Sequence, residues 1–301
     1  MRLMVERINL KMGLITRNEN GWCSTQLREA MKRQGITPMS FSLHQLVARV
    51  KYAPKASIGE TDILKDLNAI IVRPIGRGSL EEIIFRMDVL HRLERLGMLI
   101  VNPPSSIERS VDKYYTLALL EEHGLPIPRT AVTENPDEAL KAFHELGKDV
   151  VVKPLFGSRG MGSTRISDPD IATRVFRTVS FYHGVLYLQE FIQHGFSDVR
   201  TFVVGNRVLA SMRRVANTWK TNVSLGAKPI HIKLDEEMED LAVKATETIG
   251  CKVAGVDLLD GSQGPMILEV NSQPGWRGLQ SVTKVNIADE IVRYVLSELK
   301  A

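Results

Sequence analysis

The sequence predicts an α/β protein whose N-terminal domain, residues 1–103, is built on an open parallel sheet. Two observations carry this prediction. Strand-like and helix-like stretches alternate along the first hundred residues, which is typical of a parallel sheet covered by helices. The pair Pro103-Pro104 then closes the alternation and marks a natural domain boundary. Beyond it, strands and turns are expected to outnumber helices.

Hydrophobic spacing and turn residues give the individual elements. In the first domain, the expected strands are 12–16, 69–72 and 98–101, and the expected helices are 26–33 and 80–96, ended by Gly35 and Gly97. Further on, the expected helices are 110–123, one beginning after Asn135-Pro136, 236–249 and 286–300, and the expected strands include 130–132, 150–153 and 163–166. Between residues 153 and 271, only the helix 236–249 is expected to interrupt strands and turns.

Composition and charge exclude several classes of protein. The net charge is only +4 and no run of five basic residues occurs, so an anionic small molecule is a better partner than a nucleic acid. Apolar runs reach about six residues, whereas a membrane span needs roughly 18. Polar residues interrupt the N-terminus, and Cys23 and Cys251 fit neither a disulfide framework nor a zinc pattern. We therefore expect a cytoplasmic protein.

Three oxygen-bearing side chains meet on a predicted hairpin, residues 253–271. The turn-forming segment 260–265 would place Asp257 opposite Glu269, and Asn271 would share the face of Glu269 because strand side chains alternate. We expect Val256, Leu258, Leu268 and Val270 to fill the core from the other face. Such oxygens suit Mg²⁺, although a solvated polar face of a hairpin is an equally simple interpretation.

A buried lysine and a glycine-rich segment follow one another in the middle of the chain. Lys153 ends the apolar stretch 150–153, where burial would be costly without an anionic partner. The alternative is that it ends an edge strand and points to water. The glycine-rich segment that follows would let backbone N–H groups approach phosphate, and it consists of Gly157, Ser158, Arg159, Gly160, Met161 and Gly162. It leads into a strand, so it is neither a Walker loop nor a dinucleotide-binding turn. A mobile lid is one interpretation and an ordinary turn is the other.

Two more segments complete the series. Residues 185–192 form an apolar strand that could receive an adenine edge, and Asp198, Arg200, Arg213 and Asn222 then supply charge and an amide. An ordinary buried strand and a solvated charge cluster are the alternatives.

The order of these features resembles the ATP-grasp superfamily over roughly residues 104–290. The resemblance implies a nucleotide bound between two α+β lobes, 104–187 with the flap and 188–301 with the metal site. It makes Lys113 and Lys153 contacts of the phosphates and assigns Asp198 and Arg200 to the nucleotide. The implied adenine hinge is Gln189, Glu190, Phe191 and Ile192, and the implied ligands of a magnesium pair are Asp257, Glu269 and Asn271.

The details are most similar to the RimK-like amino-acid ligases. The segments 253–257 and 269–275 carry this likeness, and Gly255 stands where D-alanine–D-alanine ligases usually have arginine. Residues 73–79 and 271–276 are similar to the archaeal tetrahydromethanopterin:α-L-glutamate ligases. The resemblance implies ATP, two Mg²⁺ ions with Mn²⁺ as a substitute, L-glutamate, a small acceptor with a terminal carboxylate, and a homo-oligomer.

The implied reaction is carboxylate–amine ligation through an acylphosphate. Lys153 would neutralise developing charge, Arg213 would stabilise an oxyanion or hold the acceptor carboxylate, and Asn222 would contact a phosphate oxygen. Three alternatives stay open: a ligase acting on a protein C-terminus such as that of a ribosomal protein, a glutamate ligase of a deazaflavin coenzyme, and a non-catalytic ATP-binding module.

Overall fold

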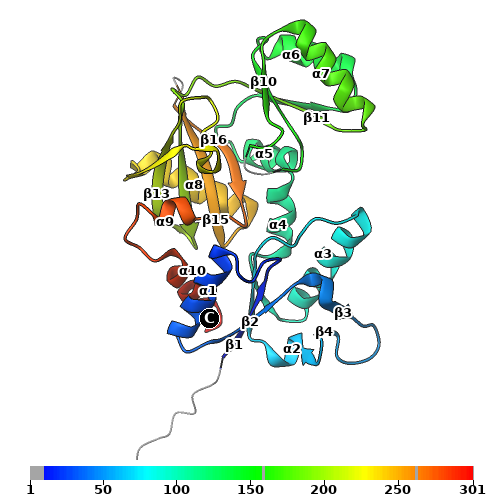
Figure 1. The fold of residues 1–301 in the computed structure, drawn as a ribbon, viewed down its shortest axis with the longest axis vertical. Coiled ribbons are helices and arrows are strands. Elements are labelled where there is room, and N and C mark those ends of the chain that lie inside the picture. The colour runs from blue at the N-terminus through cyan, green and yellow to red at the C-terminus, as the bar shows by residue number, and fades with distance from the viewer. Residues whose placement is uncertain (1–9, 158–159, 262–263, 301) are drawn as a thin grey trace, which may run out of the picture. The chain divides into compact units, whose positions relative to one another are not determined.

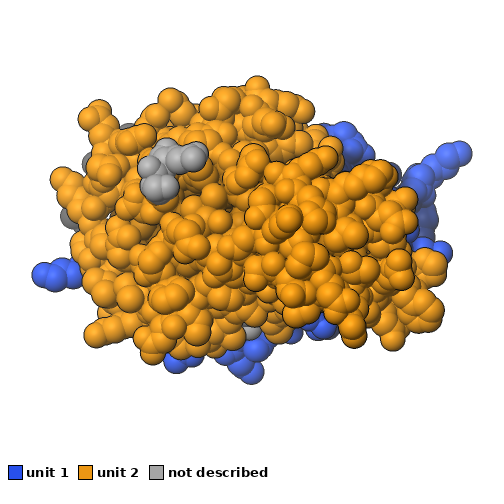
Figure 2. All heavy atoms as spheres, turned by 90° about the horizontal axis from the view of Figure 1, so that it is seen from above, with its two compact units in different colours: residues 1–107, 273–280, 284–301 blue, residues 108–272, 281–283 orange. Residues whose placement is uncertain are grey.

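The computed structural model describes residues 10–157, 160–261 and 264–300, and the chain divides into two compact units. Unit 1 comprises residues 1–107, 273–280 and 284–301, and unit 2 comprises residues 108–272 and 281–283 (Figure 2). The expected lobe 188–301 therefore differs from the structure, because residues 284–301 belong to unit 1. Helix α10 (Ile287–Glu298) packs on α1 (Trp22–Arg33) there, with Arg33 Nη2 2.7 Å from Asp289 Oδ1.

Unit 1 contains the predicted open parallel sheet. Its strand order is β2 (Thr37–Phe41), β1 (Lys11–Ile15), β6 (Ala69–Val72) and β7 (Leu99–Val101), and all neighbours are parallel. The other elements of the unit are α1, α2 (Ile63–Asp66), α3 (Leu80–Arg95), α9 (Arg277–Gln280), α10, η1 (Leu43–Gln45), β3 (Leu46–Ala48), β4 (Ala56–Ile58) and β5 (Thr61–Asp62). The small antiparallel sheet β3-β4-β5 was not predicted.

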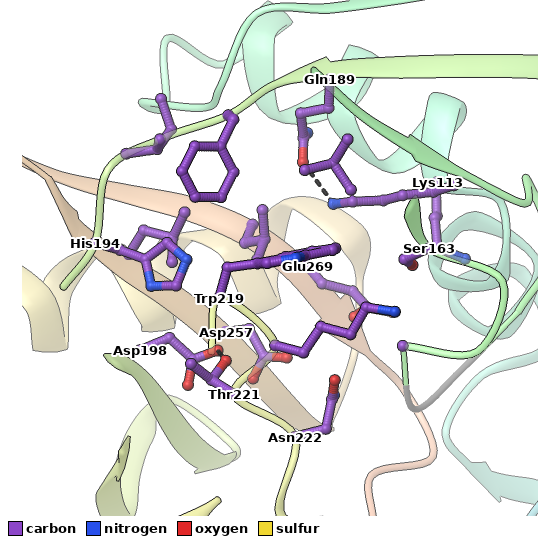
Figure 3. A pocket seen from close by; sticks show the side chains of 18 of the residues that line it. Lys113, Ser163, Gln189, His194, Asp198, Trp219, Thr221, Asn222, Asp257 and Glu269 are labelled. Atoms are coloured by element: carbon purple, nitrogen blue, oxygen red, sulfur yellow. Dashed lines mark hydrogen bonds between the residues drawn. The ribbon is translucent and has the colours of Figure 1, made fainter. Parts of the chain in front are cut away.

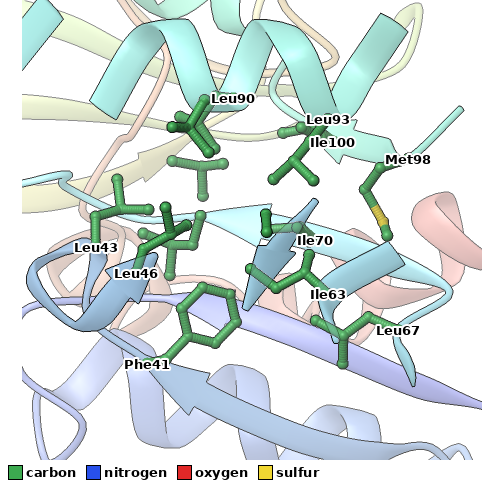
Figure 4. Close-up of a cluster of buried hydrophobic side chains, with 14 of the residues drawn as sticks. Phe41, Leu43, Leu46, Ile63, Leu67, Ile70, Leu90, Leu93, Met98 and Ile100 are labelled. Carbon is green, nitrogen blue, oxygen red and sulfur yellow. The ribbon is translucent and has the colours of Figure 1, made fainter. Parts of the chain in front are cut away.

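Helix α3 covers one face of this sheet (Figures 1 and 4). Leu90 and Leu93 pack with Ile70 and Ile100 in one buried cluster. The helix begins at a reciprocal cap, in which Ser79 Oγ accepts from the backbone of Glu82 and Glu82 accepts from the backbone of Ser79. The predicted helix 80–96 is thus confirmed.

Unit 2 contains a small antiparallel sheet with two helices on one face (Figure 1). Its strand order is β10 (Thr164–Ile166), β9 (Val150–Lys153), β11 (Leu186–Glu190) and β8 (Thr130–Thr133), and its helices are α6 (Pro136–Glu145) and α7 (Pro169–Phe181). Phe143 and Phe176 from these helices pack with Val150, Val152 and Leu188. The expectation of no helix between 153 and 236 was wrong. The cap Asp168 and the following proline are the start signal of α7 that was missed.

The second sheet of unit 2 has five antiparallel strands. Its order is β14 (Lys228–Ile232), β13 (Arg207–Val215), β12 (Ser197–Val204), β15 (Val253–Gly261) and β16 (Gly264–Asn271), and the accompanying helices are α5 (Lys113–Glu122), α8 (Glu236–Ile249) and η2 (Val223–Leu225). The predicted single helix 110–123 is two helices, because α4 (Pro104–Val111) ends before Asp112 and the Asp112 side chain caps α5 by accepting from Tyr115 N at 3.0 Å.

The two faces of this sheet differ in chemistry. Val199, Val203 and Leu258 pack with α8 in the core. Because side chains alternate along a strand, Asp198 and Asp257 lie on the opposite face. The carboxylates Asp198 and Asp257 therefore lie on the side of the sheet that faces away from this core.

Candidate active site

A pocket in unit 2 gathers most of the predicted site residues (Figure 3). The predicted residues that line it are Lys113, Lys153, Gly157, Gly160, Met161, Gln189, Glu190, Phe191, Ile192, Asp198, Asn222, Asp257 and Glu269. Ser158 and Arg159 lie outside the described residues. Gly162, Arg200, Arg213 and Asn271 are described but are not among the lining residues.

Lys153 ends strand β9 and points its ammonium toward Gln189, whose Oε1 accepts from Nζ at 2.6 Å. Burial lowers the pKa of Lys153 to about 8, an effect that Glu269 opposes and Lys113 reinforces. A buried cation with a neutral partner attracts an anion strongly, since little solvent screens it. Lys153 is thus suited to bind phosphate.

Lys113 supplies the second ammonium group of the pocket. It is the first residue of α5, and its Nζ donates to the carbonyl oxygens of Leu155 at 3.2 Å and Gly157 at 3.0 Å. Burial lowers its pKa, while Glu269 and Asp112 counteract this effect. The contact with Gly157 ties the lysine to the beginning of the glycine-rich segment.

That segment approaches Asn222 closely at Gly160. A Cβ built on Gly160 would lie 2.5 Å from Asn222 Oδ1, and the φ of +68° lies in the left-handed region. Only glycine fits both conditions without strain. Residues 157, 160 and 161 and the residue that Gly160 approaches, Asn222, all line the pocket.

The hinge after β11 is fixed by two ion pairs. The Glu190 carboxylate accepts two hydrogen bonds from Arg129, one from the backbone N–H at 2.8 Å and one from Nε at 2.7 Å. Arg165 is held by both carboxylate oxygens of Asp149, at 2.7 and 2.6 Å, and its guanidinium lies 3.5 Å from the ring centroid of Phe191. Phe191 lines the pocket, so this stack supports one of its walls.

A network of four charges lies on the five-stranded sheet, and three of its members, Asp198, Arg214 and Asp257, line the pocket. Asp198 accepts from Arg214 Nε at 2.6 Å, and Thr221 Oγ1 donates to the same carboxylate at 2.6 Å. Asp257 pairs with Arg200 and also with Arg214 Nη2 at 3.2 Å. Burial disfavours the charged form of Arg214, but Asp257 and Asp198 outweigh it and raise its pKa.

The hairpin β15–β16 has the predicted register at its polar end, since Asp257 pairs with Glu269. A register shift then follows between Asp257 and Leu258, so that Leu258 pairs with Ile267. As a consequence Leu268 and Glu269 both line the pocket, and Ile267 takes the core position. The expectation that Leu268 packs in the core was therefore wrong.

Besides Gly162, three predicted residues with described side chains do not line the pocket. Arg200 is held by Asp257, with Nη2 2.9 Å from Oδ2. The Asn271 amide donates to the Gly255 carbonyl at 3.4 Å. Arg213 lies 3.7 Å from the exposed Asp260. Strand alternation explains this placement of Arg213, because its neighbour Arg214 faces Asp198 and lines the pocket instead.

Sequence reasoning assigned no individual role to several lining residues. These are Tyr187, His194, Arg214, Trp219 and Thr221. Trp219 lies edge-on to Phe191 with ring centroids 6.2 Å apart, and Thr221 anchors Asp198. In the structure Asp198 pairs with Arg214 across β12 and β13. A predicted hairpin over 197–215, with its register, is the signal that could have identified Arg214 rather than Arg213.

Comparisons with known proteins agree with this geometry. The model of the RimK-like ATP-grasp domain matches residues 110–295. The chain is 33% identical over 296 residues to the tetrahydromethanopterin:alpha-L-glutamate ligase of Methanococcus maripaludis, covering 97% of this chain and 99% of the relative. It is 35% identical over 216 residues to a probable alpha-L-glutamate ligase of Legionella pneumophila, covering 70% and 72%.

The fold is also shared with solved structures. The ATP-grasp ligase PsnB, solved with a minimal precursor, Mg and ADP, superposes with a TM-score of 0.76 at 20% identity and covers 97% of this chain and 98% of PsnB. No helix in the described part of the chain is long and apolar enough to cross a bilayer. The parallel sheet, the two antiparallel sheets of unit 2 and the match over 110–295 lead to one conclusion: this chain belongs to the RimK-like ATP-grasp family.

Proposed function

We propose that this chain is an ATP- and Mg²⁺-dependent ligase that joins L-glutamate to the carboxylate of an acceptor, tetrahydromethanopterin. The observation that carries the proposal is a pocket lined by two half-buried lysines, Lys113 and Lys153, and by carboxylates that include Asp257 and Glu269, in a chain 33% identical over 97% of its length to a ligase of that name. Both lysines suit a polyphosphate, and both carboxylates suit a divalent cation.

The chemistry of the residues around Asp257 fits magnesium. Asp257 and Glu269 are register partners, and both carboxylates line the pocket. We propose that Asp257, Glu269 and Asn271 hold two Mg²⁺ ions, which Mn²⁺ could replace. When bound, the metal would neutralise charge on the transferring phosphoryl group. A neighbour of the same fold was solved with Mg and ADP.

The protein's own groups have separate roles in the proposed reaction. Lys113 and Lys153 bind the phosphates. The hinge Gln189–Ile192, which includes Phe191, encloses the base. The acceptor carboxylate attacks the γ-phosphorus, the bond to ADP breaks, and an acylphosphate forms. The glutamate amine then attacks the acyl carbon and phosphate leaves. Asn222 and the glycine-rich segment limit the access of water to the acylphosphate.

We propose that the nucleotide lies between two lobes. One is built around the small sheet, whose strand β11 runs past the expected boundary at residue 187 to Glu190, and the other is built around the five-stranded sheet and ends with β16. Arg213 was expected to act on the oxyanion. Arg214 lines the pocket and takes this role in the proposal. The chain is further proposed to form a homo-oligomer, as relatives of this architecture often do.

The acceptor is tested by mass spectrometry of reaction products. The protein is incubated with ATP, Mg²⁺ and L-glutamate together with tetrahydromethanopterin, a deazaflavin coenzyme or a peptide with a ribosomal-protein C-terminus. We expect the pterin to gain one glutamate residue and ADP to form in equal amount. A mass gain of glutamate on another acceptor alone would overturn the assignment of tetrahydromethanopterin as the acceptor. Binding of ATP without ADP formation in the presence of any acceptor would favour a non-catalytic module.

A variant of the metal site tests catalysis itself. Glu269→Gln keeps the size of the side chain and removes its charge, so acceptor-dependent ADP release should disappear. Turnover equal to that of the unaltered protein would show that Glu269 does not hold the metal.

A further inference from the structure

Gln189 was expected to face the adenine, but its side chain is committed to the protein. It is only 1% exposed, and its Oε1 accepts from Lys153 Nζ at 2.6 Å (Figure 3). Its Nε2 donates to Thr130 Oγ1 at 3.0 Å and to Tyr187 OH at 3.2 Å. Both amide hydrogens are therefore used within the small sheet.

Thr130 determines which way this amide points. The Thr130 hydroxyl donates its single hydrogen to the carbonyl oxygen of Pro128 at 3.0 Å, so toward Gln189 it can only accept. The NH₂ end of the amide must then face Thr130, and the oxygen must face Lys153. A flipped amide would place N–H groups against an ammonium and leave both without an acceptor.

The strand register brings these groups to one face of the sheet. Gln189 pairs with Thr130 across β11 and β8, and Lys153 pairs with Tyr187 across β9 and β11. Since side chains alternate, all four point to the pocket side, while Val150, Val152 and Leu188 fill the core behind them. The chain of hydrogen bonds runs from Lys153 through Gln189 to Thr130 and ends at Pro128.

We propose that Thr130 and Gln189 form a relay that positions the ammonium group of Lys153 for the triphosphate, with Thr130 as a positioning residue that does not line the pocket. The inference rests on the proposed function, in which Lys153 binds phosphate. An amide oxygen holds Nζ in place without neutralising its charge, so the remaining N–H groups stay available to an anion. A carboxylate at position 189 would instead compete with the phosphates.

The ionisable groups near Lys153 fit this role. Burial lowers its pKa to about 8, Glu269 and Asp257 raise it, and Lys113 lowers it. The relay contributes a neutral acceptor to a site where both signs of charge are already present. It therefore fixes the position of the ammonium group rather than its charge.

The relay is tested with a substitution that removes the Thr130 hydroxyl at constant size. Thr130→Val should lower kcat/KM for ATP by about three- to tenfold, the effect of losing one hydrogen bond. Thr130→Ser keeps the hydroxyl and should restore the unaltered value. The control is Thr133→Val on the same strand, which should leave kcat/KM unchanged. Among the described residues, Thr133 Oγ1 makes one hydrogen bond, accepting from Asn135 N at 3.0 Å.

Two further variants separate failure of the relay from failure of the proposed function. Gln189→Glu should raise KM for ATP and move the alkaline limb of the pH profile of kcat/KM to higher pH, because a carboxylate stabilises the charged lysine. Equal kinetics of Thr130→Val and Thr133→Val, with an inactive Lys153→Met, would overturn the relay alone. Full activity of Lys153→Met would instead overturn the role of Lys153 in the proposed function.

Discussion

The two antiparallel sheets of unit 2 hold their buried charges in opposite ways. On the small sheet, the Lys153 ammonium has a neutral amide as its hydrogen-bond partner. On the five-stranded sheet, Asp198 and Asp257 are balanced by Arg200 and Arg214. The first arrangement leaves positive charge available to an anion. The second keeps two carboxylates ionised in a buried wall, where isolated charges would be very costly.

The largest effect is expected where the balanced network meets the proposed metal. Asp257→Asn removes a carboxylate from beside two arginines and should lower turnover at least about a thousandfold. It should also lower the free energy of unfolding by about 3 kcal/mol, because a buried partner is lost. Asp260→Asn, on the same strand but half exposed, is the control and should change neither. Kinetics and denaturant unfolding measure both quantities, and unchanged turnover would refute the metal assignment.

Removing the Lys153 ammonium group from the small sheet should lower activity nearly as much. Lys153→Met should lower kcat/KM for ATP about a hundredfold, as removal of one charge-stabilising donor does in other active sites. Unlike Asp257→Asn, it should not weaken the fold by loss of a charged partner, because among the described residues the hydrogen-bond partner of Lys153 is the neutral amide of Gln189 and no carboxylate forms an ion pair with it. Lys141→Met, an exposed lysine paired with Glu138, serves as the control. A loss of stability as large as that of Asp257→Asn would contradict the contrast between the sheets.

A smaller effect is expected where the glycine-rich segment meets Asn222. Gly160→Ala adds a Cβ 2.5 Å from Asn222 Oδ1 at a φ of +68°, so kcat/KM should fall about tenfold as the contact opens. Gly147→Ala has a φ of +87° and open space around it, which makes it a control for backbone strain alone. Equal activity of the two variants would show that the Asn222 contact does not matter.

The pH dependence of activity tests the role of Lys153 on the small sheet without any substitution. Lys153 must be charged to bind phosphate, so kcat/KM for ATP should decline as pH rises above about 8, the pKa of this lysine in the free protein. Its ordinary value is 10.5, so the unfolded chain binds more protons between these two values. This group therefore makes the free energy of unfolding rise with pH in that window. A flat activity profile to pH 10 would indicate that the charge is not required.

The smallest effect concerns the hinge. Arg165→Met removes the guanidinium stacked on Phe191 and should raise KM for ATP about two- to fivefold with kcat unchanged. Arg129→Met, which breaks the more exposed pair with Glu190, should have a weaker effect. Isothermal titration with ADP measures which of the two variants binds the nucleotide more weakly. Weaker binding by Arg129→Met would show that Arg129, and not Arg165, supports the wall formed by Phe191.

The sequence predicted the parallel sheet and the pairing of Asp257 with Glu269, because both follow from local signals: apolar stretches ended by glycine, and turn residues between two strands. It failed at Leu268, since a register shift depends on the packing of both strands and leaves no mark in an alternating pattern. It also chose Arg213 over Arg214. Adjacent arginines have the same chemistry, and only the pairing with Asp198 decides which one faces the pocket.

Gln189 shows a different limit of sequence reasoning. It was predicted to belong to the site and it lines the pocket, but the direction of its side chain depends on a hydroxyl 59 positions away. The sequence names the donors and acceptors, whereas strand pairing decides which of them meet. Long-range polar networks are therefore the part of a site that is hardest to derive from a single sequence.

The place of α10 has a consequence for how the chain matures on the ribosome. Unit 1 begins before unit 2 in the chain, yet its helix α1 is covered by α10, which is made after all of unit 2. The sheet and α3 can form early, whereas the face of α1 that meets α10 stays uncovered until α10 has been made. Unit 2 can thus complete its core first, although it begins later in the chain.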